Sequence, residues 1–296
     1  MKRRKFAQLI GVTAISMGSS SFRFVKDKNP MNRIGMSTVN FRERFVNTRS
    51  KDSSFSGSDM NLMEIPVYFA DRFKLHNVEF WSKHFESIDA AYLKELRDVI
   101  KKQKSRLINI QFDENYQLGD PDGSKRKESL QLALQWLQVA KDLGSGAIRV
   151  NPGNGDLQYA IESLKIINRE AIKKGLILMT ENHFGMEMDP EVHLKIVKTV
   201  GKNMYTLPDF GNYSDENRFN ALRKICPFAY QMSAKSIDFD ENMKHTSFDF
   251  DQCMQIAVDS GFKGIYSVEQ WSPTAPKVSD EAIADWMIEK VKPYCS

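Results

Sequence analysis

The stretch LILMTENHFG, residues 176–185, decides the fold. Five apolar or small residues run directly into Glu181, Asn182 and His183, with Gly185 close behind. A short apolar run of this kind is typical of a strand buried on both faces of a parallel sheet. Because a buried carboxylate is costly, a strand that ends on one indicates that chemistry takes place at the carboxyl end of the sheet.

The same pattern recurs along the chain. Short apolar runs alternate with amphipathic stretches, and Gly144 and Gly175 follow helical stretches at positions where a residue that tolerates positive φ ends a helix. Eight such units predict an α/β fold, a single-domain (β/α)8 TIM barrel over residues 29–296, and no Gly-rich dinucleotide motif follows a strand. The predicted strands are 32–37, 76–81, 106–112, 146–151, 176–181, 204–209, 229–235 and 264–269.

The first 28 residues differ from the rest. Arg3 and Arg4 precede a mildly apolar run that is too short to span a bilayer comfortably, which is the pattern of a twin-arginine export signal. We therefore expect an exported, periplasmic protein that is either released or tethered to the membrane by this leader. A disordered basic tail is the alternative, because no clear A-x-A cleavage site follows.

Charge and cysteine content narrow the function classes. Seven of the 42 basic residues and one of the 38 acidic residues lie in 1–28, so the body is slightly acidic and nucleic acid is not an expected partner. The three cysteines, Cys226, Cys253 and Cys295, lack paired metal-ligand spacing, and their odd number argues against a disulfide framework.

Polar side chains gather where four predicted strands end. Glu181, Asp209 and Glu269 end three of them, and Ser233 and Lys235 share one face of a fourth. In a barrel these strand ends meet at one rim, where converging carboxylates repel one another unless a cation or a proton lies between them. A divalent metal is therefore expected, with Mn²⁺ or Mg²⁺ favoured by oxygen ligands and Zn²⁺ or Co²⁺ as alternatives.

Five motifs at barrel spacing carry a family resemblance. Their order resembles the xylose-isomerase-like TIM barrel superfamily, the sugar phosphate isomerase/epimerase group, over roughly residues 32–292. The motifs are IRVNPG (148–153), ENH (181–183), PDFGN (208–212), AKS (234–236) and VEQW (268–271).

The resemblance implies a metal site. In that family a glutamate, an aspartate, a histidine and a second glutamate bind the metal, and the two glutamates move a proton between neighbouring sugar carbons through an enediolate. Glu181, Asp209 and Glu269 match by position, but Ser233 stands where relatives often have the histidine. The expected ligands are therefore the three carboxylates with Gln231 or water.

Further side chains are candidates for catalysis and substrate binding. Lys235 could donate a proton or stabilise an oxyanion, with a structural ion pair as the alternative. Side chains near the predicted mouth could bind a sugar by stacking or hydrogen bonding, with core packing, a loop histidine or an ion pair as alternatives. They are Trp81, His84, Arg149, His183, Asn212 and Trp271.

Three functions are consistent with this pattern. The first is a metal-dependent sugar isomerase or epimerase in which Glu181 and Glu269 transfer a proton next to a carbonyl. The second is an exported lyase or hydratase that acts on keto sugars or 3-keto-glycosides with the same groups. The third is a sugar-binding barrel without catalysis. In each case the partner is a small carbohydrate, no membrane contact is expected beyond the leader, and an oligomer is compatible with the sequence.

Overall fold

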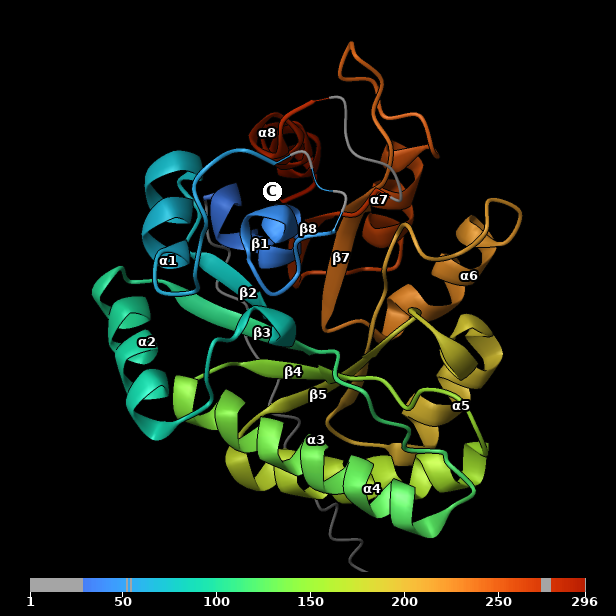
Figure 1. The fold of residues 1–296 in the computed structure, drawn as a ribbon. Helices are drawn as coiled ribbons and strands as arrows, with labels where there is room; N and C mark the ends of the chain where they lie inside the picture. Colours follow the sequence, from blue (N-terminus) through green and yellow to red (C-terminus); the bar gives the residue numbers. More distant parts are fainter. Residues whose placement is uncertain (1–28, 52, 54, 273–277, 296) are drawn as a thin grey trace, which may run out of the picture.

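The computed structural model describes residues 29–51, 53, 55–272 and 278–295. The predicted export leader therefore lies outside the described residues. Eight parallel strands occupy the centre and helices surround them (Figure 1), which confirms the predicted (β/α)8 barrel. The strands are β1 (Ile34–Ser37), β2 (Asn77–Trp81), β3 (Arg106–Phe112), β4 (Ala147–Val150), β5 (Ile177–Glu181), β6 (Met204–Leu207), β7 (Gln231–Ser236) and β8 (Ile265–Gln270).

The helices lie between the strands in sequence and outside them in space. They are α1 (Ile65–Tyr68), α2 (Ala90–Lys102), α3 (Gly123–Leu143), α4 (Leu157–Lys174), α5 (Pro190–Val200), α6 (Arg218–Ile225), α7 (Phe250–Asp259) and α8 (Asp280–Val291). Single-turn or irregular helical segments lie at η1 (Pro30–Arg33), η2 (Thr38–Arg44), η3 (Phe69–Phe73), η4 (Ser82–His84), η5 (Gly185–Met188), η6 (Cys226–Phe228) and η7 (Lys292–Cys295). None of the described helices is both long and apolar enough to cross a membrane.

Local sequence fixes where the longer helices begin and end. The Asp156 carboxylate accepts hydrogen bonds from the first backbone amides of α4, and Asp122 does the same for α3. Both helices end at a glycine with positive φ, Gly144 at 75° and Gly175 at 72°, as the sequence predicts.

The barrel closes between β6 and β7 through sparse pairing. Seven neighbouring pairs form continuous ladders in the order β6-β5-β4-β3-β2-β1-β8-β7, whereas β6 and β7 meet only at isolated bridges such as Asp209 with Ser233. The sixth predicted strand extends to Asp209, but β6 ends at Leu207 because Pro208 has no amide hydrogen to continue the ladder. Asp209 is therefore placed by a bridge and by loop contacts.

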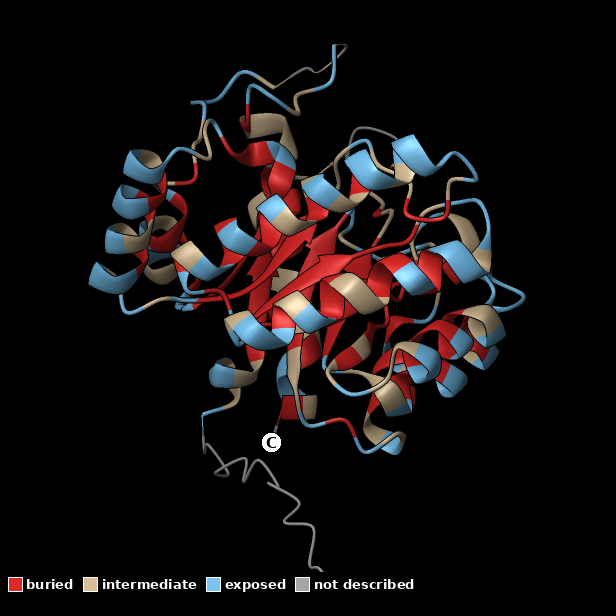
Figure 2. Cartoon of the chain, turned by 90° about the horizontal axis from the view of Figure 1, so that it is seen from below, coloured by how far each residue is buried: buried red, intermediate tan, exposed pale blue. Residues whose placement is uncertain are grey.

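The core has an apolar outer layer and a partly polar interior. The strands and the inner helix faces are buried while the outer helix faces are exposed (Figure 2), which fits the amphipathic pattern of the helices. Inside the barrel, Met179 and Leu207 pack together on one side, whereas Glu79, Asn109 and Ser267 are buried on the other. Because alternate strand residues face inward, this interior leads directly to the side chains of the mouth.

Candidate active site

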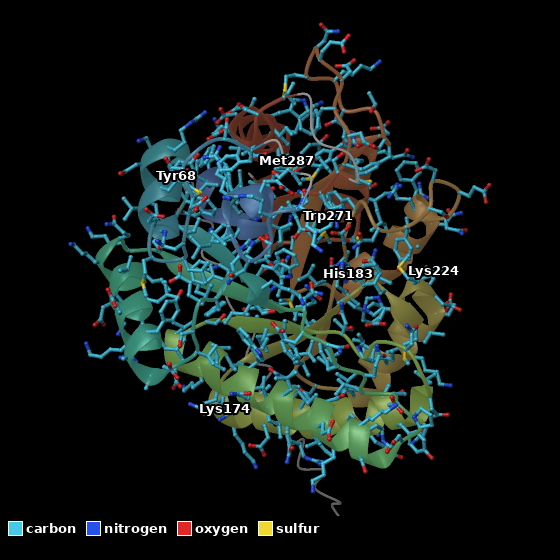
Figure 3. The ribbon with its side chains drawn as sticks, viewed as in Figure 1. Tyr68, Lys174, His183, Lys224, Trp271 and Met287 are labelled. Atoms are coloured by element: carbon cyan, nitrogen blue, oxygen red, sulfur yellow. The ribbon has the colours of Figure 1, made fainter. Side chains whose placement is uncertain are left out.

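A pocket of about 390 Å³ opens at the carboxyl ends of the strands. Every strand, or the segment directly after it, contributes a side chain, as expected for the catalytic end of a barrel. Figure 3 shows His183 and Trp271 near the centre of the ring of elements, whereas Lys174 and Lys224 lie at its periphery. The lining residues are Val39, Trp81, Lys83, Gln111, Asp113, Glu114, Arg149, Glu181, His183, Phe184, Asn212, Lys235, Glu269 and Trp271.

Lys235 lies at the centre of the predicted acidic cluster. Its Nζ is 3.3 Å from Glu269 Oε1 and 3.6 Å from Asp209 Oδ2, and it donates a hydrogen bond of 2.9 Å to Asn212 Oδ1. The paired register of β7 and β8 sets Lys235 directly beside Glu269. The structure therefore brings the predicted Asp209, Lys235 and Glu269 together.

Glu181 joins the same network from β5. Its Oε2 lies 3.2 Å from the Nε of the fully buried Arg149, and its Oε1 accepts a hydrogen bond of 3.2 Å from Asn212 Nδ2. Arg149 also forms a bidentate pair with Asp113, with both N–O distances at 3.0 Å. Asn212 thus links Glu181 to Lys235, so the three predicted carboxylates belong to one connected cluster.

The loop after β6 holds Asp209 in a fixed orientation. Asn182 exchanges two hydrogen bonds with the Asp209 backbone, and the amides of Gly211 and Asn212 both donate to Asp209 Oδ1 at 2.8 and 3.0 Å. These contacts explain why ENH and PDFGN occur together, since Asn182 comes from the first motif and the other residues from the second. Asp209 is fully buried with its Oδ2 turned towards Lys235.

The surroundings shift the pKa values of Glu181 and Glu269 in opposite directions. Burial raises the pKa of Glu181 well above its ordinary value, and the negative charges of Asp209 and Glu269 add to this effect although Arg149 opposes it. Burial also acts to raise the pKa of Glu269, but the Lys235 ammonium and a hydrogen bond of 2.6 Å from Gln111 outweigh it and hold the pKa below its ordinary value. Glu269 is therefore favoured as the ionised carboxylate and Glu181 as the proton carrier.

The donor set does not fit the divalent metal expected from the sequence. Lys235 and Arg149 already contact the three carboxylates, and Ser233 supplies a hydroxyl where a histidine ligand is expected. Across the part of the chain that the structure describes, no three or more His, Cys, Asp or Glu side chains are grouped to hold a metal ion.

Asp209 lies behind the pocket wall in contact with Lys235, whereas Gln231 and His84 lie away from both the pocket and the carboxylate cluster. Gln231 is buried four residues before Lys235 on β7, roughly 13 Å along the strand. His84 is buried below the rim, where it stacks on Phe45 and its ring nitrogens contact Thr38 and Thr48. The structure does not place Gln231 among the carboxylates or His84 on the pocket wall.

The other predicted binding residues line the pocket. Trp81 and Trp271 meet edge to face with ring centroids 6.1 Å apart, and the Arg42 guanidinium lies 4.4 Å from the centre of the Trp271 ring. Burial is the main cause that lowers the pKa of His183 to about 3, so this side chain is neutral at pH 7. Phe184 beside it is 70% exposed, which leaves a flat apolar face free at the rim.

Sequence reasoning missed two polar groups of the site. Asp113 accepts hydrogen bonds from Arg149 and from Trp81 Nε1, and Gln111 donates to Glu269. Asp113 follows β3 immediately, so the strand-end signal that identifies Glu181 also identifies Asp113. Gln111 lies two residues earlier on the same inward face, where only the known register reveals its partner.

The structural class is a (β/α)8 barrel that carries an acidic, lysine-containing pocket at the carboxyl ends of its strands. Residues 68–290 match the family described as xylose isomerase-like TIM barrel, and the chain belongs to this family. It is 23% identical over 194 residues to the L-ribulose-5-phosphate 3-epimerase UlaE of Salmonella typhi, a match that covers 58% of this chain and 67% of the relative.

Solved structures share the fold at low sequence identity. The 3-keto-D-glucoside 4-epimerase YcjR of E. coli superposes with a TM-score of 0.65 at 14% identity, covering 87% of this chain and 99% of that protein. A xylose isomerase-like TIM barrel protein from Mycobacterium smegmatis, in complex with magnesium, gives a TM-score of 0.61 at 14% identity, covering 89% of this chain and 98% of that protein.

Proposed function

We propose that this protein is a sugar epimerase or isomerase that transfers a proton at a carbon next to a carbonyl group. One observation carries this function: Glu181 and Glu269 face the same pocket from strands separated by at least two others around the barrel. Epimerisation requires a base on one face of the reacting carbon and an acid on the other. The epimerase names of UlaE and YcjR support the same reaction class.

The proton transfer follows from the electrostatics of the cluster. The Glu269 carboxylate removes the proton from the carbon, and the electron pair moves to the carbonyl oxygen to give an enolate. Lys235 donates a hydrogen bond to that oxygen, because carboxylate neighbours keep its pKa above the ordinary value although burial opposes them. Protonated Glu181 returns a proton to the opposite face, which inverts the carbon. Isomerisation results if the hydroxyl on the reacting carbon passes its proton to the enolate oxygen and becomes the new carbonyl, while Glu181 returns its proton to the former carbonyl carbon.

The pocket wall supports a carbohydrate as the substrate. Trp81, His183 and Trp271 offer ring faces and edges, while Asp113 and Arg149 offer a fixed pair of hydrogen-bonding groups. This mixture of flat apolar and charged groups suits a sugar ring, which has apolar C–H faces and polar hydroxyl edges.

A lyase or hydratase is the second candidate. The same enolate expels a β-substituent if a protonated acid lies beside the leaving oxygen, and the raised pKa of Glu181 provides such an acid. The exposed Phe184 and Trp271 rings at the rim, 70% and 40% accessible, favour a substrate longer than one sugar ring, such as a keto-glycoside. Export through the leader is part of this proposal, and cell fractionation tests it.

Solvent-deuterium exchange tests the reaction class. Keto sugars and 3-keto-glycosides are incubated with the protein in D₂O, and NMR follows deuterium uptake next to the carbonyl and the products formed. Glu181→Gln and Glu269→Gln are each expected to lower the exchange rate by roughly 10²- to 10⁴-fold without unfolding the barrel. Glu128→Gln, at an exposed position of α3, is the matched control.

The outcomes separate the candidates. An epimer or an isomer among the products supports the first candidate, and an unsaturated or hydrated product supports the second. Exchange that is unchanged in both pocket variants, or absent from the wild-type protein with every substrate, excludes the proposed proton transfer.

A further inference from the structure

We propose, building on the function above, that the Lys235 ammonium is the built-in cation of this site and takes the place of the divalent metal that the sequence predicts. The protein then works without a bound metal ion. Three features support this inference: the contacts of the ammonium, the partners of Glu181, and the space that the neighbouring loop leaves for the lysine side chain.

The ammonium lies among the oxygen atoms that a cation in this cluster would contact. Lys235 Nζ donates one hydrogen bond of 2.9 Å to Asn212 and forms ion pairs with Glu269 at 3.3 Å and with Asp209 at 3.6 Å. Asp209 Oδ2 accepts no hydrogen bond from the described residues. The lysine is only 5% exposed, so these contacts occur in a poorly solvated environment where charge pairing is strong. A metal ion between Asp209 and Glu269 would have to displace this ammonium.

Glu181 is also held by an ion pair with Arg149 and by a hydrogen bond from Asn212. Arg149 Nε lies 3.2 Å from one carboxylate oxygen, and Asn212 Nδ2 donates to the other. Asp113 holds the Arg149 guanidinium in place through two hydrogen bonds of 3.0 Å. A metal that bound Glu181 would therefore have to break an arginine contact that the surrounding structure fixes.

Two small residues favour this arrangement, one by leaving space for the lysine and one by lacking a metal ligand. A Cβ atom at Gly211 would lie 2.9 Å from Lys235 Cδ and 3.1 Å from Cγ, so the absence of a side chain there lets the lysine stem pass. Ser233 faces the same side of β7 two residues earlier, and its short hydroxyl replaces the ligand expected at this position. The chain thus lacks one metal ligand and provides a channel for the lysine.

The consequence for the reaction is specific. An ammonium stabilises an enolate through N–H hydrogen bonds and one positive charge, whereas a divalent metal binds the oxygen directly. Chelators should therefore leave the exchange reaction unchanged.

The test measures metal binding to the protein without substrate, so that its result is independent of the proposed reaction. The wild-type protein and Lys235→Gln are treated with EDTA and dialysed, and their melting temperatures are measured with and without Mn²⁺, Mg²⁺, Zn²⁺ and Co²⁺. Isothermal titration with Mn²⁺ gives the stoichiometry. Lys235→Arg, which keeps the positive charge, is the matched control.

We expect the wild-type protein and Lys235→Arg to be indifferent to all four metals. Lys235→Gln leaves three carboxylates with fewer cationic partners, so it should bind one Mn²⁺ and melt about 5 °C higher at a metal concentration about 100 times its Kd. Recovery of folded Lys235→Gln only in the presence of Mn²⁺ also supports the inference, because the metal then replaces the ammonium.

Either of two results overturns the inference. One is stoichiometric Mn²⁺ or Mg²⁺ binding by the wild-type protein with a matching rise in melting temperature. The other is a folded Lys235→Gln that binds no metal. A metal-indifferent wild-type protein that exchanges no proton with any sugar refutes the proposed function and leaves the assignment of the cation intact.

Discussion

Glu187 provides a test of the structure away from the pocket. This carboxyl group lies in η5 after β5 and is fully buried. Its Oε1 accepts a hydrogen bond of 3.2 Å from Thr180 Oγ1, and its Oε2 has no hydrogen-bond partner among the described residues. Burial raises the pKa of Glu187 to about 8, whereas its ordinary value is 4.5. The folded protein therefore keeps this group protonated at neutral pH.

The sign and the size of the effect follow from linkage. Below pH 4.5 both the folded and the unfolded chain carry the proton, so the free energy of unfolding does not change with pH through this group. Between pH 4.5 and about 8 only the unfolded chain releases it, and the free energy of unfolding falls as pH rises. One pKa unit corresponds to about 1.4 kcal/mol, so the total loss is roughly 5 kcal/mol, a large fraction of the stability of a typical domain.

Glu187→Gln replaces the buried acid with a neutral group of the same shape and removes this dependence. Urea unfolding of the wild-type protein and the variant is measured at pH 5, 7 and 9, with Glu128→Gln on the exposed face of α3 as the control. We expect the variant to gain several kcal/mol relative to the wild-type protein between pH 5 and 9. A difference that stays constant across this range refutes the assignment of a buried, protonated Glu187.

Two further substitutions test the framework of the site and the barrel rim. Arg149→Gln leaves Asp113 and Glu181 without their cationic partner. We expect it to lower the free energy of unfolding, measured by urea titration, by about 4 kcal/mol. A decrease below about 1 kcal/mol contradicts the buried ion pairs. Gly155→Ala places a Cβ atom 2.2 Å from a backbone carbonyl oxygen at φ 111°, and it should lower the free energy of unfolding by more than about 2 kcal/mol. Gly144→Ala, whose Cβ would have no atom within 4 Å, should lower it by only about 1 kcal/mol. Equal losses in the two variants contradict the close contact at Gly155.

The sequence predicts the barrel and much of the site because both depend on local patterns. Apolar runs and alternation identify the strands, and a polar residue at the end of a strand identifies the rim. Glu181, Asp209, Lys235 and Glu269 are found in this way, and the structure brings them into one cluster. Asp113 gives the same signal but lies at the start of a long polar connection, where it is easily taken for a loop residue.

Depth inside the barrel is not a local property. Alternation places Gln231 on the same face as Lys235, but the height of each residue depends on how the strands are staggered when the barrel closes. The register pairs Lys235 with Glu269 and Gln231 with Ile265, so Gln231 lies deep in the interior. The sequence also does not predict the position of His84, because η4 turns the chain after β2 and directs the His84 ring towards Phe45 and Thr48.

The need for a cation among three buried carboxylates follows from residue types alone, whereas the identity of that cation does not. A metal ion must be captured from solution by ligands of the right number and geometry, while a lysine ammonium is already attached to the chain and needs only a path to the cluster. In this chain Ser233 removes an expected ligand and Gly211 opens the path for the Lys235 stem. The departure at Ser233 is visible in the sequence, whereas the role of Gly211 becomes visible only when the path of the Lys235 stem is known. A serine in place of the expected histidine and a glycine beside the lysine stem therefore favour an ammonium over a metal ion at this site.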